Sequence, residues 1–206
     1  QVDCPDLAMG RHTRYVHLSD AEFAAVAEAN VRALNSALIN ISKEQVRIHI
    51  CWGNYAGPHH LDLNAYSVWP HVANVHCKYV LIEGANPRHG HEAVAFEQAV
   101  AAGLIDPTEL VVVPGVIDTT AARVEHPHLV AERLLRFVRA TGHPSRVMAS
   151  TDCGFASTAR SVAITADLAW RKIEALVEGA ALATKIYLEA QAPVPMKGPM
   201  LAPTPY

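Results

Sequence analysis

The sequence alternates between short apolar runs and longer segments with the spacing of an amphipathic helix, and this alternation constrains the fold more than any other feature. The run at 110–113 is almost wholly aliphatic, which is typical of a parallel strand covered on both faces. A helical pattern follows at 127–140, with Pro127 near its first turn and Gly142 as its stop. Alternating strands and helices indicate β/α units in a parallel sheet, so we predict an α/β protein with about five parallel strands.

A closed β/α barrel has eight strands, so a chain with about five is either an open doubly wound sheet or the C-terminal part of a barrel. We expect one unit over residues 1–190 and a tail rich in Pro and Gly at 191–206. The first strand ends at Pro5 and reads as a strand whose beginning is missing. The predicted strands end near residues 4, 51, 83, 113 and 150, and the predicted helices cover about 19–39, 63–77, 90–102, 127–140 and 158–188.

Polar residues with metal-binding side chains stand where several of these strands end. His49 and Cys51 are two residues apart on one strand, so both side chains point to the same side. Glu83 and Cys153 also stand where an apolar run gives way to glycine. A barrel of parallel strands gathers such ends into one mouth, where its active site forms, and four N, S or O ligands are what zinc takes in a tetrahedron.

A simpler interpretation of the His49/Cys51 pair stays open. A buried cysteine often serves as a small apolar side chain, and a histidine at a strand end is often only hydrogen-bonded. Two further cysteines, Cys4 and Cys77, are not assigned to the site, and we expect Cys77 to pack in the core. The other paired histidines are expected to be ordinary polar residues of loops and first turns: His59 with His60, His89 with His91, and His126 with His128.

Composition excludes several classes of function. With 50% hydrophobic and 18% charged residues, the 206-residue chain can bury a sizeable core. A formal net charge of −3, with no block of basic residues, argues against nucleic acid or an anionic membrane surface as the main partner. The four cysteines do not form a disulfide framework, so we expect a reducing, cytoplasmic environment.

Five motifs follow one another along residues 1 to about 160: Gln1-Val2-Asp3-Cys4-Pro5-Asp6-Leu7-Ala8, His49-Ile50-Cys51-Trp52-Gly53-Asn54, Glu83-Gly84-Ala85-Asn86-Pro87-Arg88, Pro114-Gly115-Val116-Ile117-Asp118 and Asp152-Cys153-Gly154-Phe155. In this order they resemble the strand-end motifs of the catalytic barrel of cobalamin-independent methionine synthase. The resemblance extends to shorter methionine-synthase-like proteins, a superfamily that includes epoxyalkane:coenzyme M transferase.

The resemblance implies the C-terminal part of a TIM-type (β/α)8 barrel with Zn²⁺ held by His49, Cys51, Glu83 and Cys153. It implies transfer of a methyl or alkyl group to a small, homocysteine-like thiol, as in methionine biosynthesis. Zinc stabilises a thiolate, and Glu83 is expected to yield its place to the substrate sulfur because a carboxylate is the least soft of the four ligands. By the same resemblance, Asp3 is expected to hold the amino group of the substrate.

Other positions complete or weaken the resemblance. The related enzymes carry a histidine, the expected proton donor to the departing folate, two residues after the aspartate that matches Asp118; here that position is Thr120. His126, further along the same loop, is the expected substitute, and Arg88 is expected to pair with a substrate carboxylate. The alkyl donor, whether a folate, an epoxide or another electrophile, is left open.

Two other functions are weighed against the transferase. The first alternative is a non-catalytic or partner-dependent half-barrel with a structural zinc ion, completed by a segment or chain that supplies the missing N-terminal strands. A zinc hydrolase fits less well, because two thiolates without an evident water-activating base favour thiol chemistry.

Overall fold

The computed structural model describes residues 1–55, 57–156, 159 and 163–191. Strands and helices alternate along the chain, as the sequence predicts, with short 3-10 turns between some of them. In order, the elements are β1 (Val2–Asp3), α1 (Met9–His12), α2 (Asp20–Ala37), β2 (Arg47–Ile50), α3 (Ala65–Val72), β3 (Tyr79–Ile82), α4 (Glu92–Ala101), β4 (Val111–Ile117), α5 (Pro127–Thr141), β5 (Ser150–Thr151) and α6 (Ala166–Gln191).

The strands form a five-stranded sheet in the order β1-β2-β3-β4-β5, and every neighbouring pair is parallel. Sequential strands that lie side by side, each connected through helices, are the arrangement found in a β/α barrel. The prediction of an α/β fold with about five parallel strands is therefore confirmed. None of the described helices is both long and apolar enough to cross a lipid bilayer.

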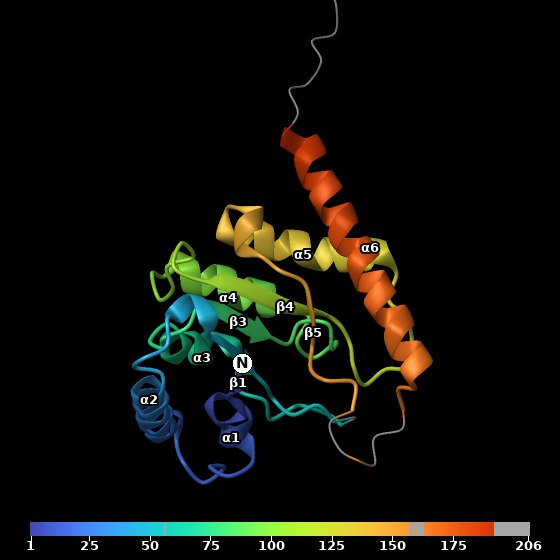
Figure 1. Cartoon of the computed structure of the whole chain (residues 1–206). Coiled ribbons are helices and arrows are strands. Elements are labelled where there is room, and N and C mark those ends of the chain that lie inside the picture. The colour runs from blue at the N-terminus through green and yellow to red at the C-terminus, as the bar shows by residue number, and fades with distance from the viewer. Residues whose placement is uncertain (56, 157–158, 160–162, 192–206) are drawn as a thin grey trace, which may run out of the picture.

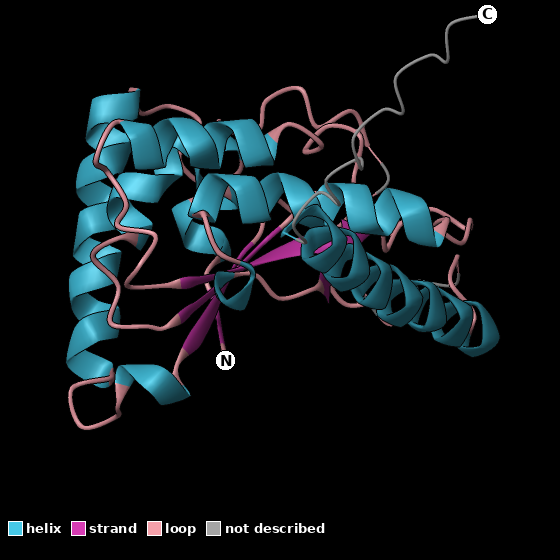
Figure 2. Cartoon of the chain, turned by 90° about the horizontal axis from the view of Figure 1, so that it is seen from above, coloured by secondary structure: helices cyan, strands magenta, loops and turns pink. Residues whose placement is uncertain are grey.

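The two faces of the sheet differ in what covers them. Helices α2 to α5 follow one another along one face (Figures 1 and 2) and cover a core that contains Ile48, Val80 and Val112. Residues that alternate with these point to the other face, among them Arg47 and Leu81, which line a cavity of about 400 Å³ there. The face with this cavity corresponds to the interior side of a barrel, and it is the side to which His49 belongs.

Local sequence signals explain where the helices begin and end. Ser19 and Glu22 form the predicted capping box of α2, with each side chain bound to the backbone N–H of the other residue. Helix α5 begins at Pro127 and ends before Gly142, whose φ of 73° is in the left-handed region that favours glycine. Figure 1 shows α6 crossing α5 and extending away from the sheet.

The last strand differs from its prediction at 146–150. A 3-10 turn at Pro144–Arg146 occupies the start of that range, and the strand itself is only Ser150–Thr151. Val147 makes an isolated bridge to Val112, and β5 then pairs with β4 with a register shift between Gly115 and Ile117. The pairing of this segment with β4 is therefore interrupted.

Two helices are shorter than predicted. Helix α3, predicted at 63–77, covers Ala65–Val72, because the side chain of Asn64 caps its start and turns follow Val72. Helix α6 begins at Ala166, just after Thr165, whose Oγ1 accepts a hydrogen bond from the N–H of Leu168. Of the predicted helix before Ala166, residues 159 and 163–165 are not helical, and 158 and 160–162 lie outside the described residues. Apart from Gln191, the last residue of α6, the predicted tail lies outside the described residues.

Candidate metal centre

His49 and Cys51 lie at the end of β2, and the parallel register gives them their neighbours. His49 pairs with Asp3 of β1 on one side and with Leu81 of β3 on the other. Cys51 is the first residue after the strand and keeps the alternation, so its side chain emerges on the same face as His49. The expected juxtaposition of an imidazole and a thiol therefore forms within one short segment.

Cys153 approaches this pair from the loop that follows β5. Its Sγ lies 3.6 Å from Cys51 Sγ and 3.4 Å from His49 Nε2. With Zn–S bonds of about 2.3 Å and Zn–N bonds of about 2.0 Å, a tetrahedral zinc ion separates two sulfurs by about 3.8 Å and a sulfur from a nitrogen by about 3.5 Å. The three ligand atoms all lie within 4.8 Å of one another, so their spacing is consistent with a zinc site. We call these three residues the thiol cluster.

Glu83 lies at the edge of the thiol cluster, at the end of β3. Its Oε1 is 3.8 Å from Cys153 Sγ and accepts a hydrogen bond of 3.0 Å from the backbone N–H of Trp52. The side chain is 2% exposed, and burial raises its pKa to about 8 against the lowering effect of that N–H. A carboxylate so poorly solvated is suited to a nearby cation, which is consistent with the expected fourth ligand.

The two thiols of the cluster lie within hydrogen-bond distance of each other. Their hydrogen bond lowers the pKa of Cys51, and His49 acts in the same direction against burial. The same bond, together with burial, raises the pKa of Cys153. The pair therefore loses its first proton easily and its second with difficulty, as expected for two acids in contact.

Asp152 holds the loops around the thiol cluster together, a role that sequence analysis did not assign. It is 2% exposed, and its carboxylate accepts hydrogen bonds from the N–H groups of Gly84, Ala85 and Asn86 at 2.9, 2.9 and 2.7 Å. The end of β5 is thereby fixed to the loop after β3, which places Cys153 beside Glu83. The sequence feature that points to this role is the position of Asp152 between the last strand and the proposed ligand Cys153.

A cavity of about 520 Å³ opens beside the thiol cluster. His49, Cys51 and Cys153 line it, together with Asp3, which receives a hydrogen bond from the amide of Gln1. Asn54 closes one side, because its side chain binds both Gly154 O and Thr119 Oγ1 at 2.9 Å. A small molecule in this cavity would meet His49, Cys51, Cys153 and Asp3 together.

The structure does not bring the remaining predicted site residues to this cavity. Asp118, His126 and Arg88 are not among the described residues that line it. Asp118 Oδ1 accepts bonds from Thr120 and Ala121 and so stabilises a turn, and exposed His126 caps the start of α5. Arg88 is directed elsewhere: its Nε donates to the carbonyl of His59.

No protein-family model matches the chain, and no curated protein matches it by sequence. Its structure does match that of a B12-independent methionine synthase from Shewanella sp. W3-18-1, solved in complex with selenomethionine, with a TM-score of 0.64 and 18% sequence identity. The match covers 91% of this chain and 48% of that one, so the chain spans about half the length of the solved protein. The expected resemblance is confirmed at the level of fold: this is an α/β chain that matches part of a methionine synthase barrel.

Proposed function

We propose that this chain provides the zinc centre of a transferase that moves a methyl or alkyl group to a small thiol such as homocysteine. One observation carries the proposal: His49, Cys51 and Cys153 converge at zinc-ligand spacing at the ends of parallel strands, beside a cavity. Glu83 is the proposed fourth ligand, at 3.8 Å from Cys153 Sγ. Bound zinc lowers the pKa of a thiol that reaches it and so makes a nucleophile available at neutral pH.

The chain's own residues would position the substrate. Asp3 lies on the same cavity as the thiol cluster and offers a carboxylate to the amino group of an amino-acid thiol. Glu83 is buried against the N–H of Trp52, which can hold it when a substrate sulfur takes its place. Arg88, proposed as the partner of the substrate carboxylate, does not line this cavity, so we assign the first contact with the amino acid to Asp3.

Proton transfer to the departing donor group is the role that we propose for His126, with Asp118 on the same loop. A matched pair of kinetic measurements separates this role from thiol binding. His126→Ala should slow transfer from a donor that needs protonation and leave binding of the thiol unchanged, whereas His128→Ala should alter neither.

We further propose that another segment or chain completes the barrel. Within the described residues β1 pairs with β2 alone, which leaves its other edge with unpaired backbone groups, and such edges tend to pair with a further strand. The open face also carries a second cavity, of about 400 Å³, lined by residues of β2, β3 and β4. The completing segment would cover this face and add to the site for the alkyl donor.

Metal spectroscopy tests the thiol chemistry directly. With Co²⁺ in the thiol cluster, addition of homocysteine should strengthen the thiolate-to-metal charge-transfer absorption, and X-ray absorption at the zinc edge should show an oxygen or nitrogen ligand replaced by sulfur. An unchanged metal environment at saturating homocysteine would instead support a structural zinc in a half-barrel without catalytic function. Transfer assays with and without the completing segment then separate a partner-dependent enzyme from a self-sufficient one.

A further inference from the structure

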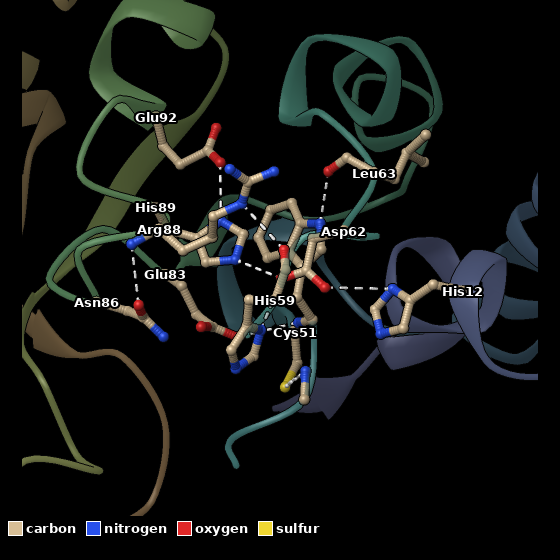
Figure 3. A network of polar contacts seen from close by, with 12 residues as sticks. His12, Cys51, His59, Asp62, Leu63, Glu83, Asn86, Arg88, His89 and Glu92 are labelled. Atoms are coloured by element: carbon tan, nitrogen blue, oxygen red, sulfur yellow. Dashed lines mark hydrogen bonds and ion pairs between the residues drawn. The ribbon is translucent and has the colours of Figure 1, made fainter. Parts of the chain in front are cut away.

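A second group of histidine and carboxylate side chains is buried apart from the thiol cluster (Figure 3). Asp62 Oδ2 lies 2.7 Å from His59 Nδ1 and 2.9 Å from His89 Nε2, and the ligand atoms of these three residues all lie within 4.8 Å of one another. Their side chains are 2% to 3% exposed. His12 of α1 completes the group, with its Nδ1 3.4 Å from Asp62 Oδ1. We call these four residues the imidazole cluster.

The outer nitrogen of two of the rings is oriented by a hydrogen-bond acceptor. His59 Nε2 lies 2.9 Å from the carbonyl oxygen of Tyr55, which can only accept, so this nitrogen carries the proton. His89 Nδ1 lies 2.9 Å from Glu92 Oε1, and a carboxylate there favours the same arrangement. In neutral rings the inner nitrogens then face Asp62 with lone pairs, which is the orientation that metal-binding histidines receive from a carbonyl or carboxylate behind them.

His12 and Asp62 also contribute polar atoms without a hydrogen-bond partner. Among the described residues, neither ring nitrogen of His12 and neither Asp62 Oδ1 nor Glu92 Oε2 has a hydrogen-bond partner, although all four atoms are buried. The side chain of His12 is 8% exposed. Buried polar atoms nearly always have a hydrogen-bond partner. His12 Nδ1 and Asp62 Oδ1 face each other at 3.4 Å without a hydrogen bond, which indicates that a ligand belongs between them.

We propose that the imidazole cluster is a second metal site, which binds a divalent transition metal such as zinc through His12, His59, Asp62 and His89. Three imidazoles and one carboxylate suit zinc and disfavour Mg²⁺ or Ca²⁺, which take oxygen ligands. The ion balances the charges of Asp62 and Glu92. Tetrahedral zinc separates nitrogen and oxygen ligands by about 3.3 Å, so the contacts of Asp62 with His59 and His89 would open by about half an ångström. The contact of His12 with Asp62, at 3.4 Å, already has about this length.

The site would stabilise the segment that carries the thiol cluster. Its ligands come from α1, from the loop after β2 and from the loop after β3, so one ion ties three separate segments together. The ring of Trp52 lies 4.5 Å from that of His89, and the N–H of Trp52 binds Glu83. An ion at the imidazole cluster would therefore fix the residue that supports the proposed fourth ligand of the other centre.

Metal stoichiometry tests the second site independently of any transferase activity. The chain, freed of metal and titrated with zinc alone, should bind two equivalents tightly. The Cys51→Ser/Cys153→Ser variant should keep one equivalent, whose X-ray absorption shows imidazole and oxygen ligands and no sulfur. The His59→Ala/His89→Ala variant should lose that equivalent and keep the sulfur-bound ion.

The exposed neighbours provide matched controls. His60 and His91 are solvent-exposed, so the His60→Ala/His91→Ala variant should still bind two equivalents. A wild-type chain that binds a single equivalent, and none in the cysteine variant, would overturn the second site, whether or not the histidine variant folds. A wild-type chain that binds one equivalent, with imidazole and oxygen ligands and no sulfur, would count against the thiol cluster and leave the second site standing.

Discussion

The thiol cluster and the imidazole cluster use the same strands in different ways. His49 lies within β2 and Cys51 directly follows it, so strand alternation fixes both side chains to one face. His59 lies nine residues beyond the end of β2, in a loop where its φ of 50° places it in the left-handed region. A strand restricts where its side chains can point, whereas a loop does so only through its contacts. The His49/Cys51 pair could therefore be derived from spacing, and the imidazole cluster only from the three-dimensional structure.

The clusters also differ in their access to solvent. The thiol cluster lines a cavity of about 520 Å³, whereas the side chains of His59, Asp62 and His89 are 2% to 3% exposed. A site that exchanges a ligand with a substrate needs an open position, and a site that only holds segments together does not. We accordingly propose chemistry at the first cluster and structural stabilisation at the second.

The largest expected contrast is between the cysteines inside and outside the thiol cluster. Burial, with a smaller contribution from Asp6, raises the pKa of Cys4 to about 12, and burial raises that of Cys77 to about 12 as well. In metal-free protein at pH 8, Cys51 should be alkylated on the order of a thousandfold faster than either, because the thiolate is the reactive form. Timed alkylation followed by mass spectrometry measures the rates. Similar rates at all three positions would contradict the electrostatic picture of the cluster.

Next in size is the effect of removing a ligand from the thiol cluster. Cys153→Ser should weaken binding of the sulfur-coordinated zinc on the order of a hundredfold, since serine does not supply a thiolate. Competition with a chelator measures the affinity. Cys77→Ala, a change at a buried cysteine outside both clusters, should leave it unchanged. Full zinc occupancy in both Cys51→Ser and Cys153→Ser would show that the proposed centre is wrong.

A smaller effect is expected from the residue that holds the loops around the thiol cluster. Asp152→Asn replaces a carboxylate oxygen that accepts backbone N–H groups by an amide that cannot accept all of them. The free energy of unfolding should fall by about 2 kcal/mol, measured by urea denaturation. Asp167→Asn, at a carboxylate that is 80% exposed, is the control and should have little effect. Equal stabilities would mean that the three N–H contacts do not support the loops.

The smallest expected effect tests the orientation of the imidazole cluster. Glu92→Gln weakens the acceptor behind His89, and metal affinity at that cluster should fall roughly tenfold. Zinc competition in the Cys51→Ser/Cys153→Ser background isolates this site, and Glu97→Gln, at an exposed position of the same helix, serves as the control. If the zinc affinity of the imidazole cluster is the same in the Glu92→Gln and Glu97→Gln variants, Glu92 does not orient a metal ligand.

Much of the architecture followed from local rules. The Ser19–Glu22 capping box, the Pro127 start and the Gly142 stop are interactions within a few residues, and they appear as predicted. The extent of the last strand could not be predicted from local rules, because it depends on pairing with β4, and that pairing shifts register between Gly115 and Ile117. Interactions between distant segments leave no spacing signal in a single sequence.

For this protein, the sequence by itself determined the parallel α/β architecture and the placement of His49, Cys51, Glu83 and Cys153 at strand ends. Strand alternation and helix capping act over a few residues, so they can be recognised from spacing alone. Tertiary structure alone decided that Asp152 anchors the loops, that Arg88 turns to the carbonyl of His59, and that His89 is buried against Asp62. These contacts join residues from 27 to 68 positions apart, and only the packing of the whole chain brings such residues together.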